Sequence, residues 1–161
     1  MGLEGVYALT VRLLRETNLS IAVALRFDGC REERQFFDGL FDGKAVLVES
    51  DRANFSTYRA IDQSRLAITL NSSSCWEALG WHHKVLFCNP TTDEYFAMPK
   101  GLWYIEGSDY EAFRRRVLEV LEMPQDEYVL RVRDGARYIM NFDPENPPHR
   151  QIRKAVLAAL G

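Results

Sequence analysis

The sequence of 161 residues has almost no surplus charge and no long apolar run. Its 20 Lys and Arg residues stand against 23 Asp and Glu residues, a net charge of −3. This balance argues against nucleic-acid binding, which needs a basic face. No apolar stretch approaches the ~20 residues of a membrane-spanning helix, so no transmembrane segment is expected. The N-terminus, MGLEGVYALT, also lacks the basic start and long apolar run of a signal peptide.

Cysteine is scarce as well. Cys30, Cys75 and Cys88 are odd in number and widely spaced, which predicts reduced thiols and a cytoplasmic protein. Their spacing is not that of a zinc site. The adjacent pair His82 and His83 has no third ligand at metal spacing, so no metal site is predicted.

Two nucleotide-binding motifs are missing. The segment FDGCREER, which follows the first predicted strand, is not the G-x-G-x-x-G loop of a nicotinamide or flavin dehydrogenase. The sequence also contains no G-x-x-x-x-G-K-(S/T), so phosphoryl transfer by a P-loop has no support. No cofactor is therefore predicted.

Short apolar runs that alternate with amphipathic segments are what the sequence does contain. Strands alternating with helices indicate an α/β fold, Rossmann-like, with three α/β/α layers and a mostly parallel sheet of about five strands. We expect one domain over 1–161, with C-terminal helices 108–161 packed on its edge. Predicted strands are 20–27, 45–49, 66–70, 84–88 and 102–105. Predicted helices are 6–16, 28–41, 58–63, a short one that carries 76–79, 108–122, 124–135 and 149–160, with a long loop over 91–101.

Three features of the predicted helices can be checked directly. Asp28 is expected to cap the helix over 28–41, and Ser108 with Glu111 forms a capping box for the helix over 108–122. In the last helix the apolar residues Ile152, Val156 and Leu160 are expected to face inward.

The stretch 61–89, IDQSRLAITLNSSSCWEALGWHHKVLFCN, is the most informative part of the chain. A strand, a serine-rich turn, a short helix and a second strand form a βαβ unit, whose two strands are parallel. Ser72, Ser73 and Ser74 follow the first strand at the point where the helix begins. Free backbone N–H groups and the helix dipole favour an anion there.

This stretch resembles the C-terminal, nucleotide-sugar-binding half of glycosyltransferases with the two-Rossmann, GT-B architecture, especially bacterial surface-polysaccharide and capsule transferases. The shared pattern is (I/L)-D-x-(S/A)-x-L-x-I-T-x-N-S-(S/T)-x-x-x-E-A-L-G-x-x-x-K-V-L-F. The resemblance implies that Ser72 and Ser73 bond the nucleotide phosphate and that Glu77 bonds the ribose hydroxyls. It also implies that Arg26 neutralises phosphate and that Glu49 and Ser50 lie near the base.

The same resemblance implies a missing partner. A complete enzyme of this type has an N-terminal Rossmann half that binds the acceptor and usually supplies the catalytic base, and only one half is present here. The expected partners are therefore a nucleotide-activated sugar as donor substrate and an acceptor-binding half or partner chain. Alone, this half is expected to bind a nucleotide but to turn over little. The expected location is the cytoplasm, or the inner membrane as a peripheral protein.

Other interpretations stay open. Ser74 and Glu77 also fit a capping box that needs no ligand. The chain is then a non-catalytic Rossmann-like module that holds a partner protein, or else half of a sugar-nucleotide epimerase. Cys75 is expected to be a buried small residue rather than a nucleophile, and the run 114–116 of three arginines is expected to be a solvated face.

Overall fold

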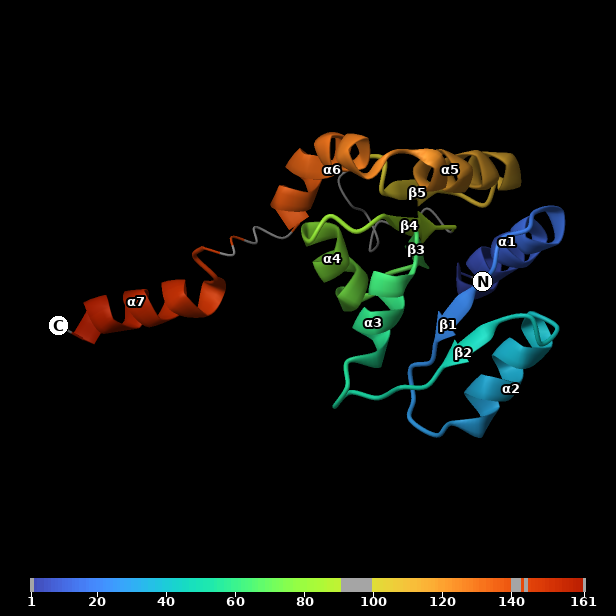
Figure 1. Cartoon of the computed structure of the whole chain (residues 1–161), viewed down its shortest axis with the longest axis horizontal. Helices are drawn as coiled ribbons and strands as arrows, with labels where there is room; N and C mark the ends of the chain where they lie inside the picture. Colours follow the sequence, from blue (N-terminus) through green and yellow to red (C-terminus); the bar gives the residue numbers. More distant parts are fainter. Residues whose placement is uncertain (1, 91–99, 140–142, 144, 161) are drawn as a thin grey trace.

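The computed structural model describes residues 2–90, 100–139, 143 and 145–160 (Figure 1). The predicted loop 91–101 lies outside this description except for residues 100 and 101. The described elements, in chain order, are α1 (Gly2–Glu16), β1 (Ala22–Ala24), α2 (Arg31–Leu40), β2 (Val46–Val48), α3 (Ser56–Gln63), β3 (Ala67–Thr69), α4 (Ser73–Gly80), β4 (Val85–Asn89), β5 (Tyr104–Glu106), α5 (Tyr110–Glu122), α6 (Gln125–Ile139) and α7 (Pro148–Leu160).

The strands form two parallel sheets instead of one. β1 pairs with β2, with Ala22 opposite Val46, and a second sheet has the order β3-β4-β5, with Ala67 opposite Val85. Within the described residues no ladder joins β1 to β3. The α/β class with parallel strands is confirmed, whereas the single sheet of about five strands is not what the hydrogen bonds form. Because β1 and β3 have three residues each, a ladder between them would add few bonds.

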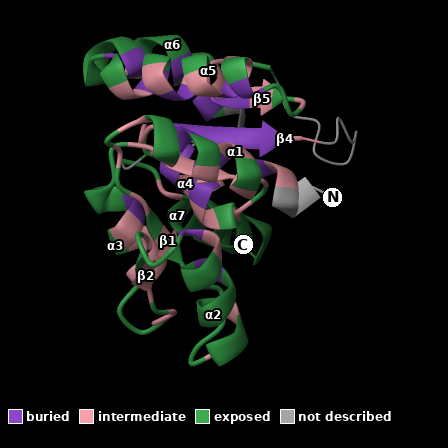
Figure 2. Cartoon of the chain, turned by 90° about the vertical axis from the view of Figure 1, so that its right-hand side faces the viewer, coloured by how far each residue is buried: buried purple, intermediate pink, exposed green. Residues whose placement is uncertain are grey.

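The main core surrounds β4, whose five residues are all buried (Figure 2). Val85 and Phe87 belong to a cluster with residues of α4 and α6, and Leu86 and Cys88 belong to a cluster with residues of α1 and α5. This alternation follows from the period of two along a strand, which sends successive side chains to opposite faces. Both faces of the β3-β4-β5 sheet are therefore covered by helices.

A buried tyrosine ties α6 to the central strand. The main-chain N–H of Val85 donates to the hydroxyl of Tyr128 at 3.0 Å. Burial raises the pKa of Tyr128 to about 12, and the bond from Val85 acts in the opposite direction. Tyr128 thus satisfies a backbone donor at the start of β4 that burial would otherwise leave without a partner.

The β1-β2 sheet is covered less completely. Val23 and Leu47 pack toward α1 and α2, but Ala22, Ala24 and Val46 are exposed, and Val46 has 64% of its surface accessible. The prediction of a long buried strand over 20–27 was wrong in length and burial, because only three residues pair, and of these Val23 is partly buried while Ala22 and Ala24 are exposed.

Helix α1 joins the two sheets. Val6 and Leu13 belong to the cluster beside β4, whereas Tyr7, Val11 and Leu14 pack against the cluster beside β1 and β2. A helix places residues three and four apart on one face, so these two sets form neighbouring stripes. One helix therefore contributes to both cores.

Two predicted helix starts were wrong. α5 is capped by Asp109 instead of Ser108, with the Asp109 carboxylate accepting from the Ala112 N–H at 2.6 Å. α2 begins at Arg31 after Cys30, which makes no side-chain cap bond, and Asp28 lies outside the helix. Before α5 two neighbouring polar residues, Ser108 and Asp109, compete for the cap. Before α2 the chain continues through Gly29 and Cys30, so the helix starts beyond Asp28.

The two last helices also differ from expectation. α6 continues through Gly135 to Ile139, and a Cβ at Gly135 would overlap the ring of buried Trp103. α5 and α6 have buried faces, but α7 buries none of its residues. Ile152, Val156 and Leu160 are exposed instead of facing inward, because α7 extends away from the body of the molecule (Figure 1).

Candidate functional site

The start of α4 is the centre of the predicted site. Ser72 is the N-cap residue with an extended backbone, and its carbonyl accepts from the N–H groups of Cys75 and Trp76 at 3.0 and 3.1 Å. The side chain of Ser72 makes no capping bond. The N–H groups of Ser73 and Ser74 have no hydrogen-bond partner among the described residues. Two backbone donors therefore remain at the positive end of this helix.

The three serine side chains have different surroundings. Burial raises the pKa of the Cys75 thiol to about 11, and the neighbouring Ser72 and Thr69 side chains act the other way, so the Ser72 hydroxyl lies beside this thiol inside the protein. The Ser74 hydroxyl lies beside that of Tyr58, whose pKa it lowers. Ser73 is exposed. Of the three predicted phosphate contacts, Ser73 is the one whose side chain has no protein partner among the described residues.

Cys75 fits the expectation of a buried small residue. It is 6% exposed and its raised pKa keeps it as the neutral thiol near pH 7. All three cysteines are free, and Cys88 is buried as well, with its pKa raised by burial to about 12.

Glu77 holds α4 to α3. The Tyr58 hydroxyl donates to Glu77 Oε2 at 2.6 Å, and this bond is the largest cause of the raised pKa of Tyr58. Tyr58 also lies in a row of aromatic rings, with centroids 6.2 Å from Phe55 and 6.4 Å from Trp81. Phe55 has a left-handed backbone (φ 53°) and an exposed ring at the start of α3. Sequence reasoning missed Tyr58, which sits nineteen positions before its partner and carries no local signal.

Arg26 lies in the loop after β1 and is not joined to the serine turn by any hydrogen bond or ion pair within the described residues. Its guanidinium carbon is 5.2 Å from the centroid of the Phe27 ring. The backbone N–H groups of Arg26 and Phe27 donate to the two oxygens of Glu33, at 2.9 and 3.0 Å. The protein's own carboxylate thus occupies the donors at the end of β1.

Glu49, predicted near the base, forms an ion pair with Arg34 of α2. Both Glu33 and Arg34 therefore tie α2 to the ends of β1 and β2. The acidic and basic run in FDGCREER was the signal for these contacts, but periodicity alone does not say which of its charges turn back toward the strands.

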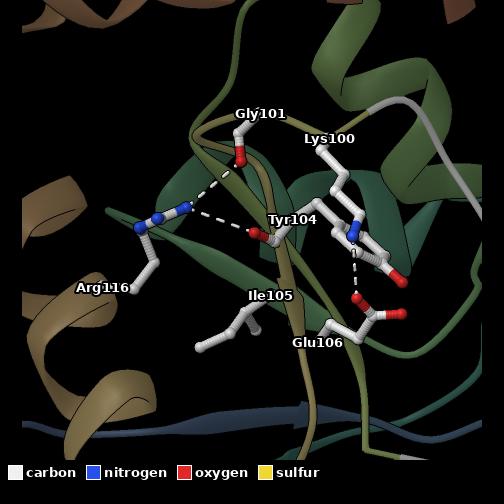
Figure 3. A pocket seen from close by; sticks show the side chains of 6 residues that line it. All are labelled: Lys100, Gly101, Tyr104, Ile105, Glu106 and Arg116. Atoms are coloured by element: carbon white, nitrogen blue, oxygen red, sulfur yellow. Dashed lines mark hydrogen bonds and ion pairs between the residues drawn. The ribbon is translucent and has the colours of Figure 1, made fainter. Parts of the chain in front are cut away.

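A hollow of about 470 Å³ lies elsewhere, beside the edge strand β5 (Figure 3). Its charged groups are already paired: Lys100 Nζ lies 3.1 Å from Glu106, and Arg116 donates to main-chain carbonyls. The Arg116 acceptors are Gly101, Leu102 and Tyr104, at 3.2, 3.1 and 3.2 Å. Arg116 therefore departs from the expected solvated run. The hollow contains none of the predicted site residues; its lining is Lys100, Gly101, Tyr104, Ile105, Glu106 and Arg116.

Metal ligands do not gather in the part of the chain that the structure describes, where no group of three or more His, Cys, Asp and Glu residues is arranged to hold an ion. His83 lies 3.9 Å from Asp62, and the neighbouring His82 has a left-handed backbone (φ 64°). Among the described helices none has the length and apolar character needed to cross a bilayer.

The first turn of α4 presents three hydrogen-bond donors, the Ser73 hydroxyl and the N–H groups of Ser73 and Ser74, and donors at a helix start favour a small anion. Comparison of the sequence with family models gives no match, and neither the curated proteins nor the solved structures give one.

Proposed function

We propose that this chain binds a nucleotide-activated sugar at the start of α4, as the nucleotide-sugar half of a GT-B-like glycosyltransferase in surface-polysaccharide synthesis. The observation that carries the proposal is the pair of N–H groups, those of Ser73 and Ser74, that have no partner among the described residues. They follow a strand of a parallel βαβ unit, where α/β proteins commonly bind ligands. The exposed hydroxyl of Ser73 adds a third donor.

The order of the strands supports the same proposal. β2-β1 and β3-β4-β5 are the two segments of the doubly wound order 2-1-3-4-5, and we propose that they are two parts of one Rossmann-like, three-layer sheet. In that order the switch point lies between β1 and β3. Arg26 follows β1 and Ser72 follows β3, so the two predicted contacts flank this point in the topology.

In the proposed reaction an acceptor hydroxyl displaces the nucleotide phosphate from the anomeric carbon of the sugar. Negative charge develops on the departing phosphate, and the N–H groups of Ser73 and Ser74 would stabilise it. The scheme requires no divalent metal. Arg26 is exposed and forms no ion pair within the described residues, so its guanidinium is available to a phosphate. A separate acceptor-binding half would supply the catalytic base, and the chain would act in the cytoplasm or at the inner membrane.

A second candidate is a non-catalytic module that holds a partner protein. The observation that favours it is the hydrogen bond of Glu77 with Tyr58, together with the position of the Ser72 and Ser74 hydroxyls beside Cys75 and Tyr58. In this case the turn serves to start α4 and to fasten α3 to it. No described feature favours the third candidate, half of a sugar-nucleotide epimerase.

Calorimetric titration with CMP, CDP, UDP and GDP distinguishes the transferase half from the interaction module. Binding of one nucleotide, weakened at least about tenfold by Ser73→Asp, supports the transferase half, because a carboxylate at this position repels phosphate while suiting a helix start. The matched control is Ser108→Asp, which adds the same charge just before α5 and should leave binding unchanged. Absence of binding by all four nucleotides, or equal loss in both variants, contradicts the proposal and favours the interaction module.

A further inference from the structure

Helix α7 (Pro148–Leu160) is an amphipathic helix with no buried residue. Ile152, Val156 and Leu160 are 64, 50 and 80% exposed. They recur every four residues, so they form one stripe along the helix. Figure 1 shows α7 standing apart from the rest of the molecule. The stripe is therefore apolar surface that the protein leaves in water.

The charge of α7 has one sign. It contains Arg150, Arg153 and Lys154 and no acidic residue. The remaining residues hold 17 basic against 23 acidic side chains, a net charge of −6, so α7 is a positively charged segment of an otherwise acidic chain. Residues two positions apart in a helix point to nearly opposite sides, which places Arg150 and Lys154 across from the stripe. Arg153 lies at its border.

A short helix with an aliphatic stripe, basic residues on the other face and no acid is the pattern of helices that lie in a membrane interface. Thirteen residues make a helix about 20 Å long, too short to span the ~30 Å hydrocarbon core but suited to lie along its surface. Long Lys and Arg side chains can extend from such a helix to lipid phosphates while the stripe enters the acyl region.

A second copy of the chain fits this helix less well. Two α7 helices packed through their stripes would carry six positive charges on one helix pair and would place the Arg153 side chain of each helix beside the seam. The exposed large apolar residues of the described body lie on separate elements; they are Phe27, Phe36, Val46, Phe55, Trp81 and Leu130. The hollow beside β5 is lined largely by polar and charged groups.

We infer that α7 docks on an anionic lipid surface, with Ile152, Val156 and Leu160 inserted and the three cations against the headgroups. Charge complementarity selects anionic over zwitterionic lipid. This inference is independent of the proposed nucleotide site.

Vesicle co-sedimentation of the full chain tests it, with phosphatidylcholine vesicles containing 30% phosphatidylglycerol and with pure phosphatidylcholine. Binding is expected with the first only and should weaken as NaCl is raised. Arg150→Gln with Lys154→Gln should lower affinity about 25-fold, at about fivefold per cation near an anionic surface. Val156→Asp with Leu160→Asp should abolish binding. The matched control, Phe36→Asp with Leu130→Asp, makes the same charge change on the body of the protein. It should leave the affinity for anionic vesicles within about twofold of the unmodified chain.

Equal binding to both vesicle types, or none to the anionic ones, would overturn the inference. So would equal loss of binding in the stripe variant and its control. Sedimentation velocity without vesicles provides the other arm. If the chain is a dimer that the double variant Val156→Asp with Leu160→Asp dissociates, the stripe binds a second copy and the inference of lipid docking is overturned. If the chain and both double variants are monomers, the inference of lipid docking is supported.

Discussion

The two sheets of this protein differ in how completely helices cover them. In the β3-β4-β5 sheet the central strand is buried along its whole length, with α4 and α6 on one face and α1 and α5 on the other. In the β1-β2 sheet, α1 and α2 cover one face, and Ala22, Ala24 and Val46 stay exposed. Parallel sheets are usually buried on both faces. The difference shows that the buried core is concentrated around the β3-β4-β5 sheet, whereas the exposed strand residues Ala22, Ala24 and Val46 belong to the β1-β2 sheet.

The largest expected effect compares one substitution in both sheets. Leu86→Ala removes a fully buried side chain from β4 and should lower the free energy of unfolding by about 3 to 4 kcal/mol. Leu47→Ala, in the half-buried β2, should cost about half as much because less surface and a smaller cavity are involved. Urea unfolding followed by circular dichroism measures both. Equal losses would mean that the two sheets are packed alike.

Two helical glycines give the next comparison. Gly135→Ala in α6 would drive a methyl group into the Trp103 ring, and should destabilise by about 1 to 3 kcal/mol. Gly39→Ala in α2 meets nothing within 4 Å and should stabilise by about 0.5 to 1 kcal/mol through helix propensity. Thermal unfolding of the two variants gives shifts of opposite sign. If Gly135→Ala is instead stabilised, the Trp103 ring can move aside for the methyl group without loss of stability.

The smallest effect concerns the contact of α1 with α5, which helps to join the two regions. Tyr110 donates to Glu16 Oε2 at 2.6 Å, and this bond, followed by that of Arg12, lowers the pKa of Glu16. A lowered pKa means that the contribution to stability is present above the ordinary pKa of Glu and is lost as pH falls through the folded value. Stability should therefore fall between pH 5 and about pH 3.

Glu16→Gln should remove part of this acid dependence, which urea titrations at the two pH values measure. Glu111→Gln on the exposed side of α5 is the control. A pH profile that Glu16→Gln leaves unchanged would mean that the loss in acid arises from other carboxylates.

Much of the fold was predictable because the sequence is periodic. All seven described helices were expected, although the bounds of α4 and the starts of α2 and α5 differ from the prediction. Helices were predicted mainly from apolar residues at helical spacing, and the five strands were predicted from short apolar runs. Boundaries were less predictable: four of the expected strands have only three paired residues, those expected over 20–27, 45–49, 66–70 and 102–105. Asp109 displaced Ser108 as a cap, since neighbouring polar residues compete and the loop geometry selects one.

The position of the serine turn was predictable from the sequence, but the contacts of its side chains were not. Ser72, Ser73 and Ser74 do begin a helix after a strand, as the spacing of 61–89 indicates. Spacing did not reveal that Ser72 lies beside Cys75 or that Tyr58 lies beside Ser74 and donates to Glu77. It also did not reveal that the Glu33 carboxylate accepts from the backbone N–H groups of Arg26 and Phe27. Each of these contacts joins residues whose meeting depends on how the elements pack.

By itself, therefore, the order of residues determined the α/β class, the positions of helices and strands, and the helix start where an anion is favoured. These are local properties, set by side-chain period and by backbone N–H groups at a helix end. Tertiary structure alone decided that the strands divide into two sheets, that α1 serves both cores and that the apolar stripe of α7 faces water. The reason is that burial depends on what lies opposite a face, and a sequence pattern specifies the face without specifying its partner.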